Sequence, residues 1–246
     1  LRAETINADR AQFALDTRTF VGMADPIESD PGWLGSLMLH HARNPLMYRR
    51  STSEKADLRV LGSLWSTRGT AGYNFGRYAV GLQAPVHLYA SGDQDTQAGS
   101  LGDIGIAGTA VVIDRRDGPL GIGFSSQFVL PTGSDRLWLS QETVSGAAAI
   151  NLSMGREVVV ATTLGFKATG PAQLDGLKLG SAAEWRTGIH LPVSQRFWAS
   201  VEADGAHHIQ SLESRGAHPV EAAAFARWAP TDTWLVTLGG GTALSA

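Results

Sequence analysis

The sequence predicts an all-β fold, a single antiparallel up-and-down barrel of about twelve strands, and three observations lead to this prediction. About eleven segments alternate apolar and polar residues with a period of two, the period of a strand with two different faces. The connections between these segments alternate between short and long. Aromatic residues gather at the strand ends beside the short connections.

Composition narrows the possible functions. The chain has 246 residues, a net charge of −3 and 17% charged residues, below the roughly 25% of ordinary soluble domains. Its net negative charge gives no reason to expect a nucleic-acid partner. Cysteine is absent, which excludes disulfides and thiolate metal sites. No run of about 18 apolar residues occurs, so we expect no transmembrane helix.

The chain divides into two parts. Residues 1–32 are polar and irregular, and we expect them to form an N-terminal periplasmic segment, whereas residues 33–246 form the barrel. Single-chain bacterial barrels usually have an even number of strands, so we expect either a final strand beyond Ala246 or closure of the seam by residues 1–32 or by a partner. The candidate strands are residues 32–41, 57–73, 78–90, 102–113, 120–131, 144–154, 158–168, 177–192, 197–205, 220–228 and 234–244.

The connections indicate a bacterial outer-membrane barrel, which has short periplasmic turns and longer external loops. The short connections contain the Gly, Pro, Asn and Asp that tight turns need. An ordinary β-sandwich has no physical reason for such strict alternation. The short connections are residues 74–77, 114–119, 155–157, 193–196 and 229–233.

The next question is which strand face looks inward. In "YAVGLQAPVHLYA" (78–90) every second residue from Val80 to Leu88 is apolar. A soluble barrel would turn these residues into its core, whereas an outer-membrane barrel turns them toward lipid. The opposite face mixes small residues with isolated charges of both signs, as a narrow lumen requires. We therefore expect lipid-facing positions at Val80, Leu82, Val86, Leu88, Ile104, Ile106, Phe124 and Phe128. We expect lumen-lining positions at Asp103, Gln127, Lys167, Lys178, Glu184, Arg186, His190, Glu202, Asp204, Glu221 and Arg227.

Aromatic residues beside the short turns support the membrane interpretation. Trp and Tyr favour membrane interfaces because their rings have an apolar body and a polar edge. We expect an interface belt of Trp33, Tyr78, Phe197, Trp228 and Trp234. A soluble β-barrel that binds a ligand is the rival at the level of the fold.

Four segments carry a resemblance to a known family. They are "FALDTRTFVGMADPIESDPGWLGSLMLHHARNPLMYR", "YAVGLQAPVHLYASGD", "GSLGDIGIAG" and "GIGFSSQFVLPTGSD". In order and spacing they resemble the N-terminal barrels of OmpA-family proteins of myxobacteria and their relatives. The resemblance runs from about Phe13 to the end, and it implies a location in the bacterial outer membrane. Such barrels are usually followed by calcium-binding repeats and a peptidoglycan-binding domain.

No catalytic set is apparent. The His-x-Ser pattern of outer-membrane phospholipases and deacylases does not occur, so we expect no enzyme activity, no metal site and no cofactor. Glu184, Arg186 and His190 share the inward parity of Glu202 and Asp204 on an adjacent predicted strand. This group is either a charged constriction that selects permeants or an ion-pair network that plugs a narrow barrel.

The function expected from the resemblance is that of an envelope anchor or scaffold. Outer-membrane lipid would surround the barrel, and envelope proteins would bind through the loops or the N-terminal segment. The alternative is a narrow passive pore for small hydrophilic solutes.

Overall fold

The alternating segments form one large antiparallel sheet in the computed structural model. The structure describes residue 15 and residues 19–48, 58–93, 96–133, 143–170, 172–174, 177–211 and 219–245. The sheet has 12 strands in an up-and-down order, so the predicted all-β up-and-down architecture is confirmed. Among the described residues, no helix is long and apolar enough to cross a membrane.

Eleven strands follow one another along the sheet, and the twelfth, β4, pairs only with β3. In the described part of the long connections lie a separate hairpin and a short 3-10 helix. The strands of the large sheet are β1 (Gly32–Tyr48), β2 (Leu58–Asn74), β3 (Tyr78–Ser91), β4 (Thr96–Leu101), β5 (Ile104–Ile113), β6 (Leu120–Leu130), β7 (Ser145–Met154), β8 (Val159–Ala168), β11 (Ala182–Ser194), β12 (Phe197–His208), β13 (Val220–Trp228) and β14 (Val236–Ser245). The hairpin consists of β9 (Ala172–Leu174) and β10 (Leu177–Leu179), and the 3-10 helix is η2 (Ile209–Ser211).

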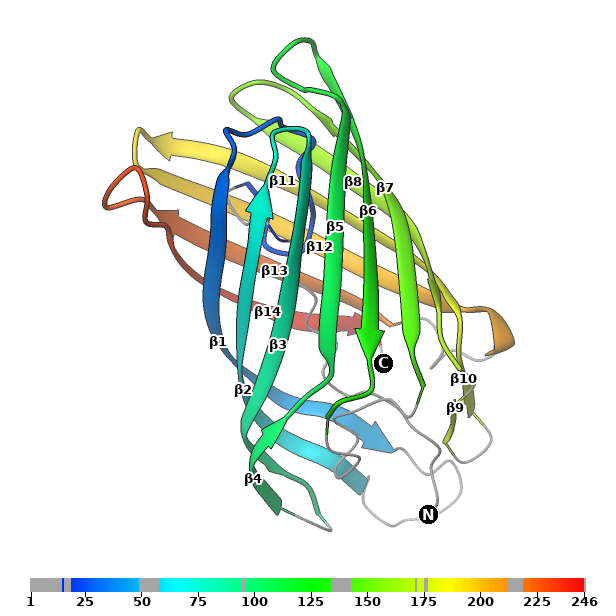
Figure 1. Ribbon diagram of the computed structural model, residues 1–246. Helices are drawn as coiled ribbons and strands as arrows, with labels where there is room; N and C mark the ends of the chain where they lie inside the picture. Colours follow the sequence, from blue (N-terminus) through cyan, green and yellow to red (C-terminus); the bar gives the residue numbers. More distant parts are fainter. Residues whose placement is uncertain are drawn as a thin grey trace.

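The sheet curls around an interior space, which we call the lumen. Figure 1 shows β1, β2, β3, β5 and β6 in the near wall and β11 to β14 in the far wall. The pairing path begins at β1 and ends at β14, and within the described residues no register joins the two. Because eleven successive strands alternate in direction, β1 and β14 run in the same direction.

The short connections lie at one end of the sheet, where tight geometry requires glycine twice. Gly76 and Gly155 both have φ of 96°, a left-handed conformation that glycine adopts without steric cost. Asn74 Oδ1 accepts a hydrogen bond of 2.8 Å from the Gly76 amide and closes the β2–β3 turn. The sequence predicted both turns from their composition.

Part of the N-terminal segment lies inside the lumen rather than outside the barrel. Residues 19–31, here called the inner segment, run between the two walls (Figure 1). Phe20 and Val21 are buried, with 0% and 1% exposed. The sequence did not indicate this position, because the segment has no strand or helix periodicity from which burial could be read.

One predicted lumen residue does not belong to the wall. Lys178 lies in β10, which pairs with β9 in a separate two-stranded sheet. Residues 180–181 belong to no strand, and the chain joins the large sheet only at Ala182. The sequence pattern ran across this break without a change of parity, so Lys178 was wrongly assigned to the same strand as Glu184.

Candidate functional site

The concave face of the sheet is polar and the convex face is apolar. Among the described residues, 18 buried residues are polar or charged and 11 are apolar, and four of these 11 belong to the N-terminal segment rather than the wall. In β3, Gln83 and His87 are buried, whereas Leu82, which precedes Gln83 and points to the opposite face, is 54% exposed. The sides are thus reversed relative to a soluble barrel, whose apolar residues fill the core.

The residues expected to face lipid lie on the convex face. All are exposed except Ile104, which is half-buried. The five expected belt residues are also exposed, and all lie at the end with the short turns. Trp33 is 84% exposed and has its ring centroid 5.3 Å from that of Tyr73. Phe197 and Trp228 stack at 6.1 Å on neighbouring strands, which gives that rim a band of aromatic rings.

The inner segment is anchored in the lumen by two apolar side chains. Phe20 and Met23 are buried and form a cluster with Val159 and Ala161 of β8. A Cβ atom at Gly188 of β11 would lie 2.7 Å from Met23 Cε. Glycine at this position therefore leaves the room that the Met23 side chain occupies.

Glu202 of β12 binds the backbone of the inner segment. Its two carboxylate oxygens accept hydrogen bonds of 2.8 Å from the Val21 amide and 2.9 Å from the Gly22 amide. Arg227 of β13 forms an ion pair of 3.3 Å with the same carboxylate. Arg227 also donates to Ser200 Oγ over 3.0 Å. The buried arginine balances the charge of Glu202 from the wall, while the carboxylate oxygens face the segment.

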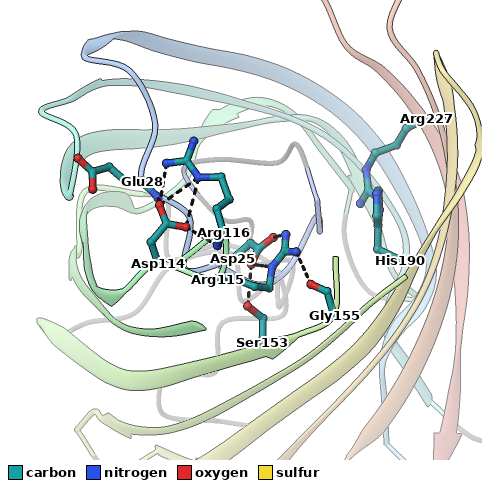
Figure 2. A network of polar contacts seen from close by, with 9 residues as sticks. All are labelled: Asp25, Glu28, Asp114, Arg115, Arg116, Ser153, Gly155, His190 and Arg227. Carbon is teal, nitrogen blue, oxygen red and sulfur yellow. Dashed lines mark hydrogen bonds and ion pairs between the residues drawn. The ribbon is translucent and has the colours of Figure 1, made fainter. Parts of the chain in front are cut away.

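Arg186 and His190 of β11 extend this group. The Arg186 guanidinium donates a hydrogen bond of 2.6 Å to the Gly22 carbonyl and lies 3.8 Å from the Glu184 carboxylate. His190 Nδ1 is 3.4 Å from Arg227 Nη1, and Figure 2 shows the two side chains side by side on the wall. The inward parity of β11 thus brings the predicted residues together on one side of the segment.

Asp204 and Glu221 complete the predicted group nearer the end with the long connections. Asp204 of β12 pairs with Arg186 on the neighbouring strand β11 and with Glu221 on the other neighbouring strand, β13. Both carboxylic residues are exposed, unlike Glu202. They line a part of the lumen that the inner segment does not fill.

Asp25 of the inner segment meets a turn arginine on the opposite side. Figure 2 shows the Asp25 carboxylate facing the Arg115 guanidinium, with distances of 2.8 Å (Nη2–Oδ2) and 3.2 Å (Nε–Oδ1). Ser153 Oγ donates to the same carboxylate over 2.8 Å. Arg115 also donates to the Gly155 carbonyl (2.6 Å) and, through its amide, to the Pro26 carbonyl (3.1 Å). Three parts of the chain therefore meet at one buried ion pair.

A second acidic group fixes the segment at the rim. Asp114, in the turn after β5, accepts a hydrogen bond of 3.0 Å from the Glu28 amide and one of 2.7 Å from Arg116 Nη2. Burial acts to raise the pKa of Asp114, but hydrogen bonds from the Arg116 side chain and from the Arg116 and Glu28 amides outweigh it and lower the pKa. Glu28 in turn pairs with Arg77 over 3.0 Å.

The inner segment leaves part of the lumen unfilled. A cavity of about 90 Å³ lies beside it, lined mostly by small and uncharged polar residues. Across this space Gln127 donates to Gln83 over 3.4 Å. Asn151 joins Ser125 (3.1 Å) and Thr163 (2.8 Å) in a short chain of hydrogen bonds. The cavity is therefore lined by groups that water can solvate.

The remaining predicted lumen residues lie apart from the inner segment. Asp103 is buried just before β5 and accepts a hydrogen bond of 3.1 Å from the Gly133 amide. Lys167 is half-buried on the inward parity of β8. Ser66 Oγ and His87 Nδ1 lie 2.7 Å apart nearby in β2 and β3. This Ser–His pair is 0% and 1% exposed, which leaves a substrate no access to the hydroxyl.

Sequence reasoning missed the residues that hold the inner segment at the turn end. Asp25 was assigned to an irregular segment, and Asp114, Arg115 and Arg116 were treated only as turn residues. The sequence contained one signal, an acid-rich stretch before the first strand and a basic turn far along the chain. Nothing in the spacing, however, indicated that the two would meet.

Comparisons with known proteins leave the family open. Within the described part of the chain, no group of three or more His, Asp or Glu residues is placed to hold a metal ion. No protein-family model matches the chain, and no curated protein matches it.

Proposed function

We propose that this protein is an integral outer-membrane β-barrel that serves as an envelope anchor or scaffold, with its lumen closed by the inner segment. The observation that carries the proposal is the reversed sidedness of the sheet. Large apolar side chains cover the convex face of the described strands. Monomeric soluble proteins rarely expose apolar patches beyond a few hundred Å², whereas lipid favours such a surface.

The strand lengths fit a bilayer. Strands β5, β7 and β8 have 10 residues each. Ten residues at about 3.3 Å each, tilted by about 40°, span about 25 Å, the height of the apolar band of an outer-membrane barrel. The exposed aromatic residues at the short-turn end then lie at the height of one interface, as Trp and Tyr prefer.

The scaffold role is favoured over an open pore because the inner segment crosses the lumen and is held on two sides. The Asp25–Arg115 ion pair holds it on one side, and hydrogen bonds from its backbone amides to the buried Glu202 carboxylate hold it on the other. A passive pore is the second candidate, and the unfilled polar cavity beside the segment is the observation that favours it. The anchor role follows the resemblance to OmpA-family barrels. The long connections are then the natural place for contacts with envelope proteins.

The test of this proposal is membrane insertion of the refolded wild-type protein. We expect it to float with phospholipid vesicles after an alkaline wash and to migrate differently on a gel before and after heating. We also expect little conductance in a planar bilayer. A protein that remains dispersed without detergent and stays at the bottom of the flotation gradient would contradict membrane insertion.

A further inference from the structure

We infer that the lumen is a binding site for a peptide without regular secondary structure, which the protein's own inner segment occupies, and that a separate peptide of the same sequence binds there when the attached segment is weakened. The inference rests on the proposed membrane barrel. It adds a ligand class and a site to that proposal.

The first argument is that the wall binds the backbone of the segment. Glu202 accepts from two successive amides, and Arg186 donates to the Gly22 carbonyl. Farther along, the Arg115 amide donates to the Pro26 carbonyl, and Asp114 accepts from the Glu28 amide. Main-chain hydrogen bonds supply the affinity in one common mode of peptide recognition.

The second argument is that separate pockets receive the side chains. Phe20 and Met23 enter the apolar pocket of β8 and β11, where Gly188 leaves room for them. Asp25 enters the site formed by Arg115 and Ser153. The ligand is therefore a peptide with two apolar side chains three residues apart, followed two residues later by a carboxylate.

The third argument is that the walls are suited to water when the segment is absent. Gln83, Gln127 and Asn151 line the cavity beside the segment, and Glu202 retains Arg227 as a partner. Polar and charged walls can be hydrated rather than collapse, unlike the apolar core of a soluble domain. Departure of the segment therefore opens a water-filled passage, and exchange of one peptide for another is physically accessible.

The first experiment uses the full chain with Phe20→Ser, Met23→Ser and Asp25→Asn, which leaves every wall residue unchanged. We expect this variant to insert, as heat-modifiable migration reports, and to conduct steadily in a planar bilayer. A synthetic peptide of residues 19–31 should close the conductance reversibly. An inserted variant that is silent, or a conductance that the peptide leaves unchanged, would overturn the inference.

Matched peptides test the specificity. Loss of a charge-assisted hydrogen bond pair should weaken closure by the Asp25→Asn peptide about ten- to a hundred-fold. The Asp30→Asn peptide has the same net charge as the Asp25→Asn peptide. Because Asp30 is exposed, the Asp30→Asn peptide should close the conductance as strongly as the wild-type peptide. Equal potency of the Asp25→Asn and Asp30→Asn peptides would overturn the assignment of Asp25 to the Arg115 site.

A disulfide gives a second route that leaves Phe20, Met23 and Asp25 intact. A Cβ atom at Gly123 would lie 3.3 Å from Pro26 Cβ, close to the roughly 3.8 Å of a disulfide, and the chain has no native cysteine. The oxidised Pro26→Cys/Gly123→Cys protein keeps the intact segment fixed in the lumen. In detergent micelles it should therefore bind a fluorescent peptide of residues 19–31 much less than the Phe20→Ser/Met23→Ser/Asp25→Asn variant does. Equal binding by the two proteins, or none by either, would overturn the inference. Failure of the wild-type protein to insert would instead refute the membrane proposal.

Discussion

Asp25 and Arg115 are separated by 90 positions in the sequence, yet they form a two-pronged ion pair inside the lumen. Both side chains are 7% exposed. Asp25 comes from an irregular segment and Arg115 from a turn, so the pair joins the inner segment to the end of the barrel with the short turns. Two hydrogen bonds in parallel add geometric specificity to the attraction between charges.

The first prediction concerns the energy of this pair. Arg115→Ala should lower the free energy of unfolding by about 1–3 kcal/mol, the cost of leaving a buried hydrogen-bonding group unsatisfied. The loss is smaller than for a fully enclosed pair because the inner segment can leave and expose Asp25 to water. Urea titration of Arg115→Ala, Asp25→Ala and the double variant gives the coupling energy. Purely additive losses would mean that the two side chains do not interact.

The second prediction tests which face meets lipid, using neighbouring residues of β6. Phe124 is exposed on the convex face, whereas Ser125 lines the cavity in the lumen. Phe124→Lys should cost about 2–4 kcal/mol, as for a lysine near the bilayer midplane. Ser125→Lys should cost less because its ammonium group reaches polar partners and water. Unfolding of both variants in vesicles measures the difference, and the opposite ranking would contradict the face assignment.

The third prediction is a pH dependence due to Asp114. Because its pKa is lowered in the folded protein, folding favours the ionised carboxylate. The resulting stability is complete above the unfolded pKa of about 3.9 and is lost as the pH falls through the lower folded pKa. The difference in urea midpoint between wild type and Asp114→Asn should therefore be constant above about pH 5 and shrink in more acidic solution. A difference that grows on acidification would contradict this sign.

The fourth prediction concerns the turn between β7 and β8. Gly155 has φ of 96°, and a Cβ atom there would meet the Val158 carbonyl oxygen. Gly155→Ala should destabilise the protein by about 1 kcal/mol or more through strain in the left-handed region. Gly118 in the preceding turn has open space around it, so Gly118→Ala is the matched control and should change stability by less than about 0.5 kcal/mol. Equal effects in thermal or urea unfolding would mean that backbone strain at Gly155 is not the cause.

The strands and their faces were predictable because a period of two is a local property that survives in each segment. Glu184, Arg186, His190, Glu202 and Asp204 could be grouped from parity and strand order alone. The exception was Lys178, where the alternation continued across a break in the sheet. Parity identifies the face of a strand, but it does not reveal where the chain leaves the sheet.

The occupant of the lumen was not predictable for a different reason. The inner segment has no regular secondary structure, and its partners Arg115 and Asp114 lie in a turn that reads as solvent-exposed. Contacts between such segments depend on the three-dimensional curvature of the wall. Of the two possibilities for the charged group, a selective constriction or a plugging ion-pair network, the observed contacts favour the network, with backbone amides of Val21 and Gly22 as additional members.

The most direct test of the account is a scan of the environment along β3 in vesicles. Because the chain has no cysteine, single cysteines at Leu82, Gln83, Ala84, Pro85 and Val86 can each carry a nitroxide label. Collision with oxygen, which dissolves in lipid, and with a water-soluble nickel complex then reports the surroundings of each label. We expect high oxygen and low nickel accessibility at positions 82, 84 and 86, with low oxygen accessibility at 83 and 85. Nickel accessibility at positions 82, 84 and 86 would contradict it, since the apolar face would then lie in water.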